Sequence, residues 1–161
     1  MKILKTDKRL IDEGYTYKVE GNLITDESLD LTDLDKGLYV TGYIKAGWYI
    51  EAGGSIEAGE YIEAGEHIKS GGYIEAGGCS GIVAGLGIAA PGAIKCGLKI
   101  FAGVCPWRSI DEIERTITCT ELVGCGVVEY GTLNITEKPK KTVTLELTEE
   151  QLGKIQEIIN N

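Results

Sequence analysis

Residues 43–76 read YIKAGWYIEAGGSIEAGEYIEAGEHIKSGGYIEA and repeat with a period of six residues. Each unit has an isoleucine, a small residue two positions later, and then a glycine. The isoleucines of this run are Ile44, Ile50, Ile56, Ile62, Ile68 and Ile74. After one two-residue insertion the period resumes at Ile82, Ile88, Ile94 and Ile100. So short a period predicts stacked supersecondary units and not an ordinary globular core.

One hexad, YIEAGG at residues 49–54, shows how each unit is built. Polar and apolar side chains alternate over its first four positions, which is typical of a strand with one buried face. Ile50 and Ala52 are expected to point inward, and Tyr49 and Glu51 outward. The glycines then bend the chain, because glycine adopts backbone angles that other residues avoid. A helix is excluded, since each glycine in its interior costs about 1 kcal/mol.

Three such hexads close a triangular coil of about eighteen residues, and the coils stack by parallel strand pairing about 4.8 Å apart. Residues eighteen apart are then cross-strand neighbours. The expected neighbours are Lys45 and Glu63, Glu51 and Lys69, Glu57 and Glu75, Tyr43 and Tyr61, and Tyr49 and His67. Two of the three charged pairs are opposite in sign, and the third joins two carboxylates. We therefore predict an all-β chain that folds as a parallel β-helix.

The repeat resembles that of the hexapeptide-repeat β-helix proteins over residues 38–104. In the common left-handed members a large aliphatic residue precedes glycine, whereas here Ala46 precedes Gly47 and Ile50 follows. The Ile-x-Ala pattern also resembles that of the polymer-forming bactofilins, which are right-handed. The two resemblances imply the same β-helix with opposite hands, and we favour the left-handed form.

Residues 38–104 are thus the predicted β-helix, with smaller segments on either side. Residues 1–37 are expected to form N-terminal strands and an irregular first coil, with Leu29, Leu31 and Leu34 inward. Residues 105–161 are expected to form a C-terminal cap, with strands at 116–120 and 127–135, followed by a strand-helix segment. The second half of the repeat carries apolar residues at outward positions and therefore needs a cover. These residues are Val83, Leu86, Ala89, Leu98 and Phe101.

The strand-helix segment has an alternating stretch, TVTLEL at residues 142–147, before a capping box at Thr148 and Gln151. Apolar residues then recur along one stripe of the predicted helix. This appendage is too small to bury its own apolar face, so we expect it to join a second copy in a homodimer. The predicted oligomerisation residues are Leu145, Leu147, Leu152, Ile155, Ile158 and Ile159.

Composition restricts the classes of function. The formal net charge of −9 argues against a protein that binds nucleic acid or an anionic membrane directly. No apolar run reaches the length of a membrane span and no signal peptide opens the chain, which favours the cytoplasm. The five cysteines, at positions 79, 96, 105, 119 and 125, form no CxxC pair and are interpreted as core or near-core thiols in a reducing compartment. We expect neither a metal site nor a cofactor.

His67 is the sole histidine and the first candidate for chemistry. The hexapeptide-repeat acyltransferases use a histidine in a groove between subunits as a general base, so the resemblance implies that role for His67. In this chain His67 occupies the outward position that Tyr49, Tyr61 and Tyr73 fill in sister hexads. A general base also needs a partner that orients its ring. We therefore interpret His67 as a surface residue and predict no catalytic residue.

Outward aromatic and acidic residues are the candidate partner-binding groups. Tyrosine and tryptophan are favoured anchors in protein interfaces, although a six-residue spacing distributes them over different faces. The aromatic candidates are Tyr43, Trp48, Tyr49, Tyr61 and Tyr73. The acidic candidates are Glu51, Glu57, Glu63 and Glu75 in the repeat, and Asp26, Glu27, Asp30, Asp33 and Asp35 in the run before it.

These features favour a non-enzymatic cytoplasmic protein that binds another macromolecule. In its sharpest form it is an acidic inhibitor of a basic nucleic-acid-binding protein, because regularly spaced carboxylates imitate a nucleic-acid backbone. In size and charge the chain resembles small acidic inhibitors of phages and mobile elements, including some anti-CRISPR proteins. The alternatives are a self-assembling structural β-helix of bactofilin type and a hexapeptide-repeat acyltransferase.

Overall fold

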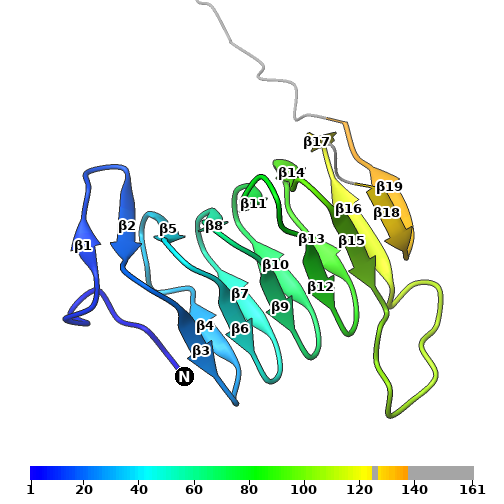
Figure 1. The fold of residues 1–161 in the computed structure, drawn as a ribbon, viewed down its shortest axis with the longest axis horizontal. Helices are drawn as coiled ribbons and strands as arrows, with labels where there is room; N and C mark the ends of the chain where they lie inside the picture. The colour runs from blue at the N-terminus through cyan, green and yellow to red at the C-terminus, as the bar shows by residue number, and fades with distance from the viewer. Residues whose placement is uncertain (125–126, 138–161) are drawn as a thin grey trace, which may run out of the picture.

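The computed structural model describes residues 1–124 and 127–137, and this part of the chain contains nineteen β-strands and no helix. The strands form one seven-stranded and two six-stranded sheets around a single apolar core (Figure 1). Successive strands pass from sheet B to sheet C to sheet A, so each set of three makes one coil. The architecture is the predicted parallel β-helix, whose hand stays a prediction.

The three sheets are defined by their strands. Sheet A contains β4 (Leu29–Leu31), β7 (Ile50–Ala52), β10 (Ile68–Ser70), β13 (Ile88–Ala89), β16 (Thr116–Cys119) and β19 (Thr132–Ile135). Sheet B contains β1 (Ile11–Asp12), β2 (Thr16–Val19), β5 (Gly37–Val40), β8 (Ile56–Ala58), β11 (Ile74–Ala76), β14 (Ala93–Lys95) and β17 (Glu121–Val123). Sheet C contains β3 (Leu23–Thr25), β6 (Ile44–Ala46), β9 (Ile62–Ala64), β12 (Ile82–Ala84), β15 (Lys99–Ala102) and β18 (Val127–Tyr130).

The sheets extend beyond the repeat on both sides. β2, β3 and β4 form the expected irregular first coil, with Leu29, Leu31 and Leu34 buried. β16 to β19, which follow the repeat, stack in parallel on the preceding coils instead of covering them. Residues 104–115 leave the fifth coil between β15 and β16 as a projecting loop (Figure 1). The solenoid therefore has six coils, of which the first and the last lack the Ile-x-Ala pattern.

The register between coils is the predicted one. Ile44 pairs with Ile62, Ile50 with Ile68, and Ile56 with Ile74, each eighteen residues apart. The neighbours expected on the outside follow this register. Lys45 Nζ lies 2.9 Å from Glu63 Oε1, and Lys69 Nζ lies 2.9 Å from Glu51 Oε1. The rings of Tyr43 and Tyr61 stack at 4.6 Å, and those of Tyr49 and His67 at 5.1 Å.

The two-residue insertion lies at one corner of the triangle, as expected. It lengthens the register from eighteen to twenty residues, so that Ile62 pairs with Ile82 and Ile74 with Ile94. The register returns to eighteen at Ile82 and Ile100. The extra residues form a turn in which Ser80 N–H donates to Gly77 O at 2.9 Å. The corner thus absorbs the insertion without displacing the buried isoleucines.

The core is a column of stacked side chains on each face. The isoleucines from Ile44 to Ile82 are completely buried, and the small residues between them are nearly so. Cys96 and Cys119 occupy the small-residue positions as buried thiols, and burial raises the pKa of both. The interpretation of the cysteines as core or near-core thiols is wrong for Cys79, which is exposed in the corner insertion. Cys125 and the predicted strand-helix segment lie outside the described residues.

An N-terminal arm, residues 1–12, covers the first coil. Ile3 is 1% exposed because its side chain closes the open end of the core. Its N–H donates to Asp30 O at 3.0 Å, and β1 pairs with β2 as the sole antiparallel pair of the described strands. Lys2 Nζ lies 3.0 Å from Asp33 Oδ2, and Lys5 Nζ lies 2.9 Å from Asp35 Oδ2. Part of the acidic run therefore holds the arm in place.

Many of the corner glycines cannot be replaced without a shift of the backbone, because they lie against the backbone of a neighbouring coil. A Cβ on Gly77 would lie 1.8 Å from Gly59 O, whereas a Cβ on Gly78 would meet nothing within 4 Å. We expect Gly77→Ala to lower the free energy of unfolding by about 1–3 kcal/mol, since the backbone must shift. Gly78→Ala should change it by less than about 0.5 kcal/mol. Urea denaturation of both variants checks this, and equal losses would contradict the stacking of corners.

The arm should detach in acid. Lys5 and the Tyr17 hydroxyl hydrogen-bond to the Asp35 carboxylate and lower its pKa, the Lys5 bond contributing most. A lowered pKa in the folded state stabilises the docked arm above the ordinary carboxyl pKa of about 4, and this stabilisation is lost as pH falls below it. Amide exchange at Ile3 should therefore lose protection below about pH 4 while Ile62 keeps it. Asp35→Asn should show the weakened protection already at pH 7, and an unchanged Ile3 would refute this role.

Candidate protein-binding surface

The outward aromatic residues divide among the three faces, as the six-residue spacing predicts. Tyr43 and Tyr61 lie on sheet C, Tyr49 and His67 on sheet A, and Tyr73 on sheet B. Within a face they stack along the axis, because coils bring equivalent positions together. They form no single platform. Any surface that uses several of them must therefore lie along one face or along one corner.

The glutamate ladder of the repeat is largely neutralised within the molecule. Lysines eighteen or twenty residues away pair with Glu51, Glu63 and Glu75. Glu57, which faces Glu75 across the strands, accepts a hydrogen bond of 2.7 Å from the Tyr73 hydroxyl. Exposed pairs of this kind contribute about 0–1 kcal/mol each. The main effect of these pairs is that the regularly spaced carboxylates expected from the sequence are not free to bind a partner.

Several carboxylates of the acidic run before the repeat are also paired within the molecule, and others are not. Asp33 and Asp35 pair with the arm, and Asp30 accepts hydrogen bonds from Thr32, which lower the pKa of Asp30. Asp26 has no ion pair with a lysine or arginine side chain of the described residues. The Glu27 carboxylate lies 3.1 Å from the amino terminus of the chain and is exposed. These last two residues face solvent at the corner between sheets C and A.

Trp48 occupies the same corner one coil further along. Its N–H donates to Glu27 O at 3.4 Å, and its carbonyl accepts from Glu66 N–H at 2.8 Å. These backbone bonds align the three residues in one column, about 4.8 Å apart from coil to coil. The Trp48 side chain is 55% exposed. We call Asp26, Glu27, Trp48 and Glu66 the Trp48 edge.

The charge of the Trp48 edge is negative. Glu66 forms no ion pair with the described lysines and arginines, although its charge contributes to the raised pKa of Arg108. The main cause of that raised pKa is the bidentate hydrogen bond from Arg108 to Glu114, at 2.9 and 2.8 Å. The Arg108 guanidinium is thus already engaged by Glu114. Trp48 is left as an exposed aromatic ring between turns that carry carboxylates.

A groove of about 390 Å³ adjoins this edge on sheet A. His67 and Leu86 line one side, and Ile113 and Glu114 of the projecting loop line the other. The groove exists because Gly87, which has no side chain, occupies the position that His67 occupies in the neighbouring coil. The Ile113 side chain is 87% exposed. This wall was not predictable from the sequence, since nothing in residues 104–115 indicates that the loop turns back toward His67.

His67 lies in this groove with its ring stacked on Tyr49. None of the hydrogen bonds found among the described side chains involves its ring nitrogens, and the nearby Glu114 carboxylate is held by Arg108. The groove lies within one chain, whereas the acyltransferase resemblance implies a groove between subunits. The arrangement suits stacking and packing better than proton transfer, which needs an oriented ring.

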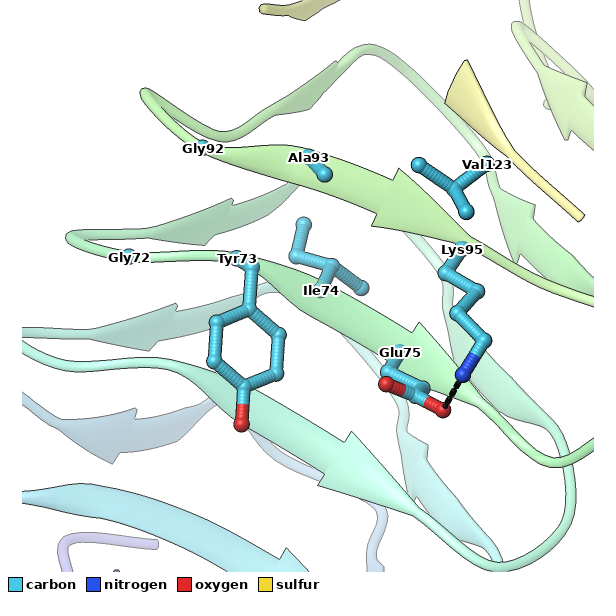
Figure 2. A pocket seen from close by; sticks show the side chains of 8 residues that line it. All are labelled: Gly72, Tyr73, Ile74, Glu75, Gly92, Ala93, Lys95 and Val123. Carbon is cyan, nitrogen blue, oxygen red and sulfur yellow. Dashed lines mark hydrogen bonds and ion pairs between the residues drawn. The ribbon is translucent and has the colours of Figure 1, made fainter. Parts of the chain in front are cut away.

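A second groove, of about 430 Å³, lies on sheet B between Tyr73 and Val123 (Figure 2). Gly92 and Ala93 leave it open, because they follow a coil that carries Tyr73. Its polar groups are already satisfied, since Lys95 Nζ lies 2.5 Å from Glu75 Oε1 (Figure 2). The Tyr73 hydroxyl donates a hydrogen bond to Glu57. The floor and the far wall are apolar. This groove offers shape but no free charge.

Both grooves have one origin in the sequence. The residue before isoleucine is bulky on three successive hexads and small on the next three. Tyr61, His67 and Tyr73 are the bulky ones, and Gly81, Gly87 and Ala93 are stacked on them. The coil that follows Tyr61, His67 and Tyr73 therefore has a smaller outer circumference at these positions. The sequence held this signal, although it is readable only once the register is known.

The apolar exterior expected of the second half lies mainly toward the C-terminal end. Phe101, Val104, Pro106 and Tyr130 line a further groove of about 540 Å³ on sheet C. Leu98 is 54% exposed at the neighbouring corner. Described residues therefore leave this part of the surface uncovered. The predicted oligomerisation residues, Leu145 to Ile159, lie outside the described part of the chain.

Comparison with protein-family models, with curated proteins and with solved structures finds no match to this chain. Among the described residues, no cluster of three or more histidine, cysteine, aspartate or glutamate side chains is placed to hold a metal ion. A helix long and apolar enough to cross a membrane is likewise not found in that part of the chain. The resemblance to hexapeptide-repeat proteins rests on the repeat alone.

The Tyr73 phenol should ionise at a higher pH than an ordinary tyrosine. Burial, reinforced by the hydrogen bond to Glu57, raises the pKa of its phenol to about 12. A raised pKa in the folded state stabilises the protein fully below the ordinary tyrosine pKa of about 10, and this stabilisation is lost as pH rises toward 12. Ultraviolet titration of the wild type and Tyr73→Phe should differ by one late-ionising phenol. A difference at about pH 10 would contradict both the burial of this phenol and its hydrogen bond to Glu57.

Proposed function

We propose that this chain is a non-enzymatic protein that binds a basic protein partner through the Trp48 edge. The observation that carries the proposal is the exposed Trp48 ring in one column with Glu27 and Glu66. In the repeat, Glu51, Glu63 and Glu75 pair with lysines, whereas Asp26 and Glu66 of this corner form no ion pair with a described lysine or arginine. Tryptophan is one of the residues enriched among the hot spots of protein interfaces.

The chemistry of the edge favours lysine or arginine side chains in the partner. Cations are attracted to the face of an indole ring and gain about 0.5–2 kcal/mol from it, depending on solvent exposure. Carboxylates at Asp26, Glu27 and Glu66 add complementary charge and raise the rate of association. The adjoining groove at His67 and Leu86 then accommodates an apolar side chain beside the cation. The sharper form of the proposal is inhibition of a nucleic-acid-binding protein, and the net charge of −9 supports it.

Self-assembly as a structural β-helix is the second candidate. The described strands leave the C-terminal edges of all three sheets without a neighbour, and unpaired edges favour end-to-end growth. The N-terminal arm opposes such growth, since Ile3 and β1 occupy the other end. Acyl transfer is weaker, because the His67 ring has no orienting partner within the described residues.

Replacing Trp48 tests the proposal, and the chain offers a matched control in Trp107, which is 73% exposed on the projecting loop. The wild type, Trp48→Ala and Trp107→Ala are each immobilised and exposed to bacterial lysate at low salt. We expect the wild type and Trp107→Ala to retain one basic protein. Trp48→Ala should bind it at least about 30-fold more weakly, as for a hot-spot residue. Equal retention by both variants would refute the role of the edge.

Experiments on the retained protein then test the sharper form of the proposal, which is inhibition of a nucleic-acid-binding protein. Retention should fall as salt rises from about 0.1 to 1 M, because screening weakens contacts between exposed charges. The purified partner should lose its bound nucleic acid when the wild-type chain is added, and keep it when Trp48→Ala is added. A partner that binds the chain and nucleic acid together would rule out inhibition by mimicry. Light scattering of the chain alone tests self-assembly, for which open polymers are expected.

A further inference from the structure

The two ends of the solenoid differ sharply in burial. At the N-terminal end the inward residues Leu23 and Leu29 are at most 1% exposed, because Ile3 of the arm covers them. At the C-terminal end the inward residues Leu133 and Ile135 of β19 are 41% and 52% exposed. An apolar core cross-section that faces water is costly, at about 25 cal/mol per Å². The C-terminal end therefore needs an occupant.

The hydrogen bonds between coils show where that occupant begins. In each coil the N–H of an inward residue donates to the next coil, as in Ile44 to Tyr61 O, Ile50 to His67 O and Ile56 to Tyr73 O, all at 3.0 Å. The same geometry aims the N–H of Leu122, the inward residue of β17, at the position of one further strand on sheet B. β17 is the last described strand of that sheet.

The chain itself arrives at that position. It passes from sheet B to C to A in every coil, and β19 ends on sheet A at Ile135. Thr136 N–H donates to Cys119 O at 2.8 Å, which keeps the chain on the solenoid up to the corner between sheets A and B. The first coil makes the same passage with residues 32–36. Residues 137–141 give a connection of similar length before the alternating stretch at 142–147.

We infer that residues 142–159 dock on the C-terminal end of their own solenoid. Residues 142–147 add to the free edge of β17, with their alternating apolar residues over Leu122. The apolar stripe of residues 152–159 lies across Leu133 and Ile135. A tethered segment acts at high effective concentration, which favours this contact over one with a second copy. The end that described residues leave open is thereby closed against end-to-end pairing.

Amide exchange in the full-length chain tests this arrangement. Ile155→Glu places a charge on the apolar stripe of the helix that the sequence predicts, and Gln156→Glu places the same charge beside that stripe as a matched control. In the wild type and in Gln156→Glu the Leu122 amide should be protected. In Ile155→Glu its protection should fall by about 10- to 100-fold, the equivalent of losing one buried aliphatic side chain. An unprotected Leu122 amide in the wild type would overturn the inference.

The molecular mass in solution distinguishes docking within one chain from the rival arrangement, in which a second copy occupies the end. Light scattering should give a monomer for the wild type at every concentration tested. A dimer that Ile155→Glu converts to a monomer would show that a second copy occupies the end, and would overturn the docking proposed here. Leu133→Asp provides the other half of the test. Combined with Ile155→Glu it should add little further loss of Leu122 protection, because both changes break one contact. Additive losses would show that the two residues do not meet.

Discussion

Parallel pairing of each coil with the next at a fixed register is the constraint on which the rest of the structure depends. It stacks isoleucine on isoleucine in the interior, as at Ile44, Ile62 and Ile82. It also presses each corner against the carbonyl groups beneath it, so that a Cβ at Gly65 or Gly77 would come within 2.0 Å of an oxygen. The register therefore also determines which outward side chains are neighbours. Ion pairs and ring stacks on the surface follow from the register and do not determine it.

The repeat made the architecture predictable, because a single period specifies strand, corner and stacking together. The expected neighbours Lys45 and Glu63, Glu51 and Lys69, and Tyr49 and His67 all meet. The strands after the repeat were harder to assign, since Leu122, Val128 and Leu133 stand where the repeat has isoleucine and Cys119 where it has alanine. Their apolar residues alternate over too few positions to distinguish a further coil from a separate cap. The strand at 116–120 was predicted, whereas β17 was not, and the single strand predicted at 127–135 divides at Gly131 into β18 and β19 on two different sheets.

The candidate surface was predictable only in part. Trp48 was recognisable as a candidate anchor from its residue type, and Asp26 and Glu27 as candidate binding residues from their charge. Sequence could not tell that Asp33 and Asp35 bind the arm, because the arm has no pattern that places Lys2 and Lys5 opposite them. The groove beside His67 depends on a loop whose direction no local signal specifies. Contacts made by irregular segments were therefore the ones that the repeat could not supply.

The corner insertion at Gly78 and Cys79 shows that this scaffold tolerates a change in coil circumference when the change is confined to a vertex. A change in the number of whole coils would have a different consequence. Eighteen residues inserted in frame would lengthen the rod by about 4.8 Å and return every face to its original direction. Six residues would turn all later faces by one side of the triangle. Chains of this type can therefore adjust the separation of two surface features in fixed increments without altering their relative orientation.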